Sequence, residues 1–138
     1  MDYSAPSRTA LEYAAFLAER LGATLDVVHV WDKPSFVPEN VTVGNPPRPL
    51  GELIAENADR EMDEFIAAAA LPAGTKIERH LASGEPSAAC LLRLSAQPYD
   101  LVVVGTHGRT GMRHLLLGSI AERLVRLSPV PVVTVPSA

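Results

Sequence analysis

The run Leu101–Val104 restricts the fold of this chain more than any other feature, because all four of its residues are apolar. A strand without a polar residue on either face belongs in a parallel sheet that helices cover on both sides. Gly105 follows the run directly and begins a glycine-rich segment that ends at Ser119. In open α/β sheets, ligands bind at this carboxyl end of the strands. The sequence therefore predicts an α/β fold with a binding loop after residue 104.

Helical and extended patterns alternate along the whole chain. Apolar spacing predicts helices over residues 6–21, 50–72, 87–96 and 119–127, and short apolar or alternating runs predict strands over 25–31, 76–81, 101–104 and 130–135. This order predicts a doubly wound, Rossmann-like parallel sheet with helices on both faces. The strand over 76–81 is expected at an edge, because it mixes charged and apolar residues. A chain of 138 residues is expected to form one domain over residues 1–138.

The segment Asp32–Leu50 carries five prolines together with Gly44 and Asn45. Proline and glycine at this density disfavour regular structure. We therefore predict an irregular loop, long enough to act as a lid or a binding loop.

Composition and charge exclude several classes of function. The formal net charge is -4, so a general attraction to nucleic acid or to anionic lipid is not expected. Aromatic residues make up only 5% of the chain, which does not suit an aromatic-lined RNA groove. No apolar run reaches the roughly eighteen residues of a membrane span, and the start has no signal pattern. We expect a cytoplasmic protein in which Cys90 is a buried, unreactive thiol.

The glycine-rich segment has the properties of an anion site. Gly105, Gly108 and Gly111 allow bare backbone amides to approach a ligand, and the helix predicted to begin at Ser119 adds its N-terminal dipole. Positive side chains gather in the same segment: His107, Arg109, Arg113 and His114. An acidic protein that concentrates positive charge beside exposed amides is expected to bind a phosphate group there.

Each of these features also has an explanation without a ligand. Ser119 and Glu122 fit a capping box, Gly118 fits close packing of helix on strand, and the arginines fit solvated charges. Three glycines at a spacing of three after an apolar strand favour ligand binding. The P-loop, GxGxxG, HExxH, CxxC and GxSxG motifs are absent. The four histidines lack the spacing of metal ligands, and His29 is expected to be a hydrogen-bonded core residue.

The pattern Gly105-x2-Gly108-x9-Gly118-Ser119 resembles the nucleotide-binding motif of the universal stress protein family. The resemblance extends over nearly the whole chain. Asp2-Tyr3-Ser4 is similar to the family's D-x-S opening, Leu25–Val30 to its second strand, and Gly84-Glu85-Pro86 to its G-x-P turn. It implies the family's fold, which is of the adenine nucleotide alpha hydrolase-like type.

The resemblance also implies a ligand and the residues that hold it. The ligand would be ATP, with the presence of Mg²⁺ left open. Asp2 would contact ribose or adenine, and the backbone of Val30 would read the adenine edge. The remaining ligand residues would hold ribose and phosphates, with Arg109 beside the phosphates: Gly105, Gly108, Gly118 and Ser119. The final strand, Val130–Val135, would form a homodimer.

One departure from the family concerns the start of the chain. Family members begin with an apolar strand in the middle of the sheet, whereas only Met1 precedes Asp2 here. We expect a shortened start, and a sheet of four strands with a gap at its centre.

The resemblance favours an ATP-binding stress-response protein that acts through nucleotide-dependent dimer or partner contacts. No catalytic residue is identified, so any ATP hydrolysis is expected to be slow. Two alternatives remain open: a nucleotide-free interaction module of the same fold, and an enzyme of adenylyl transfer. The second lacks the SGGxDS-like or HxGH-like loop that such enzymes usually carry.

Overall fold

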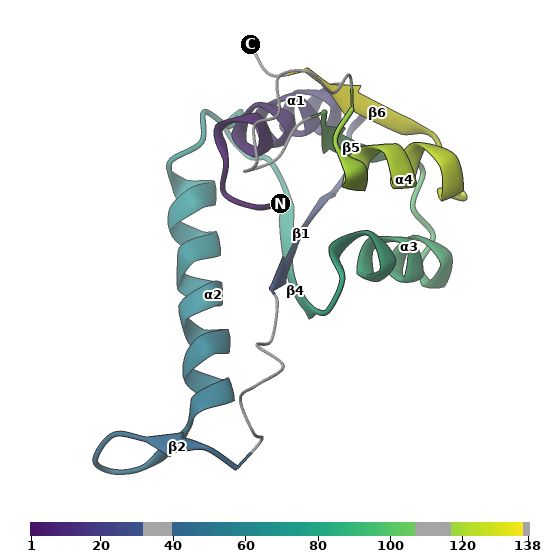
Figure 1. The fold of residues 1–138 in the computed structure, drawn as a ribbon. Helices are drawn as coiled ribbons and strands as arrows, with labels where there is room; N and C mark the ends of the chain where they lie inside the picture. The colour runs from purple at the N-terminus through teal and green to yellow at the C-terminus, as the bar shows by residue number, and fades with distance from the viewer. Residues whose placement is uncertain (32–39, 107–116, 137–138) are drawn as a thin grey trace.

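Helices alternate with parallel strands in a Rossmann-like α/β fold (Figure 1). The computed structural model describes residues 1–31, 40–106 and 117–136. In chain order, its elements are α1 (Ala5–Leu21), β1 (Leu25–Trp31), β2 (Thr42–Val43), β3 (Arg48–Pro49), α2 (Leu50–Ala67), β4 (Ile77–Ser83), α3 (Pro86–Ala96), β5 (Val102–Gly105), α4 (Ser119–Leu127) and β6 (Val132–Val135).

The parallel strands form two separate pairs. Strand β1 pairs with β4 from Leu25↔Ile77 onward, and β5 pairs with β6 from Val102↔Val132 onward. Among the described residues, no strand pairs with both β1 and β5, which agrees with the gap expected at the centre of the sheet. Helix α1 packs against β1, β5 and β6, so it joins the two pairs.

Helices lie on both sides of the β1–β4 pair. In Figure 1, α2 stands on one side of this pair and α3 on the other. Helix α3 contacts β1, β4 and α4, and α4 in turn contacts β6. The doubly wound arrangement predicted from the alternating patterns is therefore confirmed.

The main hydrophobic core lies between α1, α2 and the β1–β4 pair. Its buried residues are Leu11, Val27, Met62 and Phe65, and Met62 is 0% exposed. Partly buried apolar side chains from the first residues and from both strands complete it. The apolar faces predicted for the first two helices thus meet on one side of the sheet.

The first residues of the chain are held against β1. The Met1 amino group donates to the Val28 carbonyl, and the His29 Nδ1–H donates to the Met1 carbonyl at 2.8 Å. Tyr3 stacks on His29 with ring centroids 4.4 Å apart, and its hydroxyl donates to the Ala58 carbonyl. Burial lowers the pKa of His29. The prediction that His29 is hydrogen-bonded is confirmed, although the residue is only partly buried beside the core.

Helix α1 begins and ends as its sequence predicts. Ser4 caps it by accepting from the Ser7 N–H at 3.2 Å, and proline occupies the first turn. Gly22 ends the helix with a φ of 63°, a left-handed conformation that glycine adopts without strain.

The segment Asp32–Leu50 differs from its prediction in the part that the structure describes. Residues 32–39 lie outside the described residues, but β2 and β3 form a short antiparallel hairpin. Gly44 has a φ of 89°, which allows the chain to reverse between the two strands. The prediction of an irregular loop is therefore wrong for residues 42–49. Helix α2 ends at Ala67, before the predicted stop near Pro72.

Strand β5 is less buried than its apolar sequence predicts. Each of its four residues is only partly buried. The prediction that both faces of β5 are fully buried is therefore wrong. Within the described part of the chain, β5 has a strand neighbour on one side only, which leaves its residues more accessible to solvent. Strand β4 has exposed Glu78 and Arg79, as expected for an edge strand.

The Cys90 thiol is partly buried in α3, and burial raises its pKa. A raised pKa keeps the thiol protonated and weakly nucleophilic, as predicted. In the described residues, no helix combines the length and apolarity needed to cross a membrane.

Truncation of the central core residue tests this packing. We expect Met62→Ala to lower the free energy of unfolding by about 2–5 kcal/mol, because it leaves a cavity in a fully buried site. Urea denaturation followed by circular dichroism measures the change. Leu92→Ala is the matched control, since Leu92 is 73% exposed and its loss should change stability by about 0.5 kcal/mol or less. Equal effects of the two variants would contradict the assigned core.

Candidate functional site

The two ends of the glycine-rich segment meet at the carboxyl end of β5. Gly105 is the last residue of β5, and the Thr106 N–H donates to the Val135 carbonyl at 2.9 Å. The Gly118 N–H then donates to the Thr106 carbonyl at 2.6 Å. The structure therefore brings Gly105, Gly118 and Ser119 together. Gly108 and Arg109 belong to residues 107–116, which lie outside the described residues.

Helix α4 begins at this point, and its N-cap residue has no side chain that could accept a hydrogen bond from the first amides. Gly118 is its N-cap residue, and the Gly118 carbonyl accepts from the Glu122 N–H. The predicted capping box of Ser119 and Glu122 is wrong, because Ser119 is already the first helical residue and its side chain lies past the capping position. The amides of the first turn and the positive end of the helix dipole remain suited to an anion.

Asp2 and Ser4 form a turn that leads into α1. The Asp2 carboxylate Oδ1 accepts from the Ser4 N–H at 3.1 Å and from the Ser4 hydroxyl at 2.6 Å. Asp2 therefore orients the residue that caps α1. It lines a hollow of about 570 Å³ bounded also by side chains of α1 and α2, among them Arg8, Glu61, Glu64 and Phe65.

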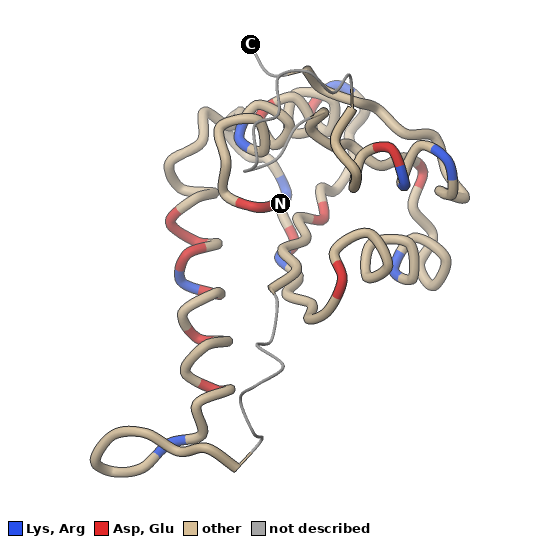
Figure 2. The backbone as a smooth tube through the Cα atoms, in the orientation of Figure 1, with Lys and Arg blue, Asp and Glu red and all other residues tan. Residues whose placement is uncertain are grey.

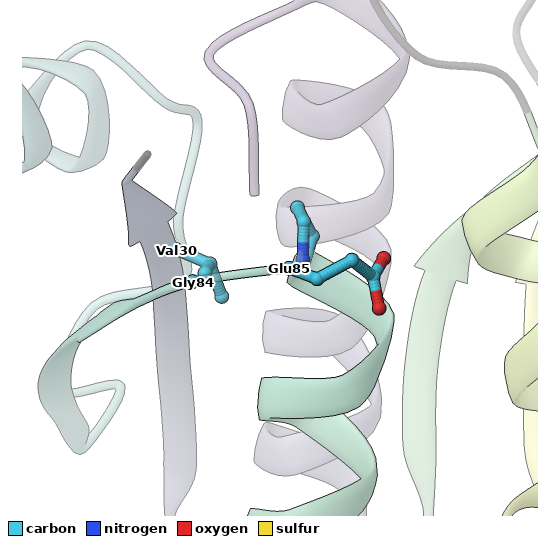
Figure 3. Close-up of a pocket in the computed structure, with 4 residues that line it drawn as sticks. Val30, Gly84 and Glu85 are labelled. Carbon is cyan, nitrogen blue, oxygen red and sulfur yellow. The ribbon is translucent and has the colours of Figure 1, made fainter. Parts of the chain in front are cut away.

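Val30 lines a second, separate hollow at the carboxyl end of β1. This pocket of about 390 Å³ is bounded by Val30, Gly84, Glu85 and Pro86 (Figure 3). Gly84 has a φ of 115°, and its N–H donates to the Trp31 carbonyl at 3.2 Å. The turn that closes the pocket therefore requires glycine at position 84. Two of the predicted ligand residues, Asp2 and Val30, line different hollows.

Glu85 is a site residue that the motif analysis does not single out. Its carboxylate accepts from the Ser87 N–H at 3.0 Å and the Ala88 N–H at 2.8 Å, so it caps α3. It also pairs with Arg123 of α4 at 3.3 Å. Hydrogen bonds from the side chain and backbone of Ser87 lower its pKa, and Ala88 and Arg123 add to the effect. An acidic residue before Pro86 is a sequence signal for a helix cap, whereas the pairing with Arg123 follows only from the tertiary structure.

Acidic residues are concentrated along α2, whereas α3 carries an arginine and α4 carries arginines together with Glu122 (Figure 2). The Glu85–Arg123 pair connects the pocket beside Val30 with the helix that begins at Ser119. The candidate site thus consists of the turn after β4, the carboxyl ends of β1 and β5, and the start of α4.

These features define a class of protein: a doubly wound α/β protein whose glycine-rich segment lies at the carboxyl end of a parallel strand. The model of the universal stress protein family matches residues 1–136, and the chain belongs to that family.

Named relatives agree with this assignment. Universal stress protein MJ0531 of Methanocaldococcus jannaschii is 31% identical over 137 residues, which cover 97% of this chain and 77% of the relative. Universal stress protein YxiE of Bacillus subtilis is 29% identical over 147 residues, which cover 98% and 94%. The crystal structure of a universal stress protein in complex with cAMP matches the fold with a TM-score of 0.66 at 24% identity, covering all of this chain and 93% of the other.

The capping role of Glu85 predicts a pH dependence of stability. Its pKa in the folded state lies below the ordinary 4.5, so the unfolded chain binds a proton more readily. The carboxylate therefore contributes stability above about pH 4.5, and this contribution is lost as the pH falls through the folded pKa. Thermal unfolding between pH 7 and pH 3 should show a smaller loss in Glu85→Gln than in the wild type. Glu19→Gln, which neutralises an exposed carboxylate of α1, should follow the wild type; the same flattening in both variants would contradict the capping role.

Proposed function

We propose that this protein binds an adenine nucleotide, ATP, at the carboxyl ends of its parallel strands. The observation that carries the proposal is the hydrogen bond from the Gly118 N–H to the Thr106 carbonyl. It returns the glycine-rich segment to β5 and brings the start of α4, whose N-cap is Gly118, close to Gly105. Backbone amides, a helix dipole and nearby glycine are the features that bind phosphates in this type of sheet.

Separate parts of the site would hold separate parts of the nucleotide. Gly105, Gly118 and Ser119 would bind ribose and phosphates, together with Gly108 and Arg109 from the segment outside the described residues. The pocket beside Val30 would take the adenine, whose edge the Val30 backbone would read. Its volume of about 390 Å³ falls in the usual range of about 300–1,000 Å³ for ligand pockets.

Asp2 would approach the ribose from the turn before α1. In the structure its carboxylate is engaged with Ser4, so its contribution would combine a ligand contact with the orientation of that turn. Mg²⁺, where it accompanies ATP, would bind through the phosphates, which are its usual ligands.

The related structure in complex with cAMP supports an adenine nucleotide as the class of ligand. Nucleotide occupancy would be read out in a stress response through contacts with a second copy of the chain. Strand β6 offers an edge for that dimer, because its pairing within the described residues is with β5 alone.

Binding is tested by isothermal titration with ATP after any copurified nucleotide has been identified by mass spectrometry and removed. We expect saturable binding in the wild type and an affinity at least about tenfold lower in Gly118→Val, because the valine side chain would occupy the space through which the phosphates approach the backbone. Gly118 has a φ of -68°, so valine fits its backbone and the fold should persist.

The matched control is Gly51→Ala in α2, where an added Cβ meets nothing within 4 Å. It should bind ATP as the wild type does. A folded, nucleotide-free wild type that ignores ATP would overturn the proposal and favour the interaction module. Equal binding by Gly118→Val would overturn the assigned position of the phosphates.

The dimer edge is tested at Thr134. The Val102 N–H donates to the Pro131 carbonyl and the Thr106 N–H to the Val135 carbonyl, and alternate residues of a parallel strand turn their peptide groups to opposite neighbours. The Thr134 N–H therefore lies on the outer edge of β6. Thr134→Pro removes this donor while leaving the β5 pairing intact, so it should shift the mass measured by sedimentation from dimer to monomer. Thr134→Val keeps the donor and should remain dimeric; a wild-type monomer would refute the dimer.

A further inference from the structure

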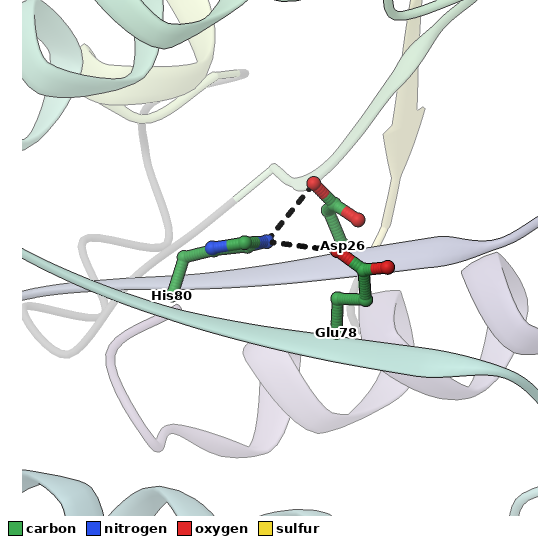
Figure 4. Close-up of side chains that lie close together, drawn as sticks. All are labelled: Asp26, Glu78 and His80. Carbon is green, nitrogen blue, oxygen red and sulfur yellow. Dashed lines mark ion pairs between the residues drawn. The ribbon is translucent and has the colours of Figure 1, made fainter.

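A cluster of three metal-ligand side chains lies on the β1–β4 pair, outside the candidate nucleotide site. Asp26 of β1 stands opposite Glu78 of β4, and His80 follows two residues later on the same face of β4. Figure 4 shows the two carboxylates and the His80 ring converging. Their ligand atoms all lie within 4.8 Å of one another. The spacing of histidines in the sequence gives no sign of this cluster, because its members come from two strands whose register only the fold reveals.

The distances in the cluster fit a tetrahedral ion. His80 Nε2 lies 3.0 Å from Asp26 Oδ2 and 3.9 Å from Glu78 Oε2. Zinc binds nitrogen and oxygen at about 2.0–2.2 Å, so two of its tetrahedral ligands lie about 3.3–3.6 Å apart. The two observed separations lie on either side of that range. Small side-chain movements would therefore bring all three atoms to a common ion.

The burial of the His80 ring nitrogen is a second observation beside these distances. Its Nε2 is buried and has no hydrogen-bond partner, although the Asp26 carboxylate is close. A metal ion would form a bond to this nitrogen, whereas the Asp26 carboxylate lies close to it without forming a hydrogen bond.

Two neighbouring side chains hold Asp26 in position from the other side. Its Oδ2 accepts from the Tyr99 hydroxyl at 2.5 Å and from Arg93 Nη2 at 3.1 Å. Hydrogen-bonded carboxylates of this kind are typical of metal sites, where outer partners orient the ligands. The Arg93 charge opposes a cation and limits its affinity, while Glu78 supplies a second negative charge.

We propose that Asp26, Glu78 and His80 form a binding site for Zn²⁺. Three protein ligands leave the fourth tetrahedral position to water, and Glu78, whose side chain is 66% exposed, gives the ion access from solvent. An imidazole ligand selects zinc over Mg²⁺ and Ca²⁺, which take oxygen ligands. The site lies apart from the pocket beside Val30, so this proposal is independent of nucleotide binding.

Titration of the chelator-treated protein with Zn²⁺ tests the site, with Mg²⁺ as the contrasting ion. We expect one Zn²⁺ per chain, no response to Mg²⁺, and visible absorption bands of tetrahedral Co²⁺ when cobalt replaces zinc. His80→Gln and Glu78→Gln should each lower the Zn²⁺ affinity at least tenfold and abolish the cobalt bands. Tyr99→Phe, which removes an outer partner of Asp26, should lower it about tenfold.

Glu52→Gln at the far end of α2 is the charge-matched control and should bind Zn²⁺ as the wild type does. Circular dichroism shows whether each variant is folded. Absence of Zn²⁺ binding in the wild type would overturn the proposal. Undiminished binding by folded His80→Gln would also overturn it, since the ion would then be held elsewhere in the chain.

Discussion

Helix α1 holds together two pairs of strands that share no hydrogen bonds in the described part of the chain. It packs on β1, β5 and β6, and its buried residues are mostly alanines: Ala10, Leu11, Ala14, Ala15 and Ala18. Small side chains let a helix approach a sheet closely, so packing against α1 connects the two strand pairs where no hydrogen bonds between strands do so. The relative position of the pocket beside Val30 and the start of the glycine-rich segment at β5 therefore depends on this packing. The Asp2–Ser4 turn, which sets where α1 begins, contributes to the same constraint.

Most of the framework could be predicted from the sequence because it depends on local patterns. Apolar spacing indicated α1, α3 and α4 to within a residue, and the β-branched run gave β1 with its bounds. Gly22 and Gly84 have the backbone conformations that their positions suggest. The hairpin of β2 and β3 could not be predicted, because strands of two residues give no recognisable pattern in a proline-rich segment. The capping box was misjudged because the choice between Gly118 and Ser119 as N-cap depends on where the chain returns to β5.

The candidate site divides in the same way. Gly105, Gly118 and Ser119 could be found from their spacing, and the structure brings them together. The Glu85–Arg123 pair and the Asp26–His80 contact could not, because each joins residues far apart in the chain. Such contacts follow from strand register and helix packing, which a single sequence does not fix. Residues of a contiguous motif can thus be found from the sequence, whereas pairs that join distant parts of the chain cannot.

The bond between Gly118 and Thr106 also has a consequence for how this segment can change during evolution. It ties the two ends of the intervening chain, so α4 keeps its starting point whatever lies between them. Doubling the length of a flexible loop with fixed ends costs only about 0.6 kcal/mol of closure entropy. Insertions and deletions between residues 106 and 118 should therefore change the free energy of unfolding only slightly. The fold therefore depends on the two anchoring peptide groups, whereas a fixed spacing of Gly108 and Arg109 would be required by the proposed nucleotide and not by the fold.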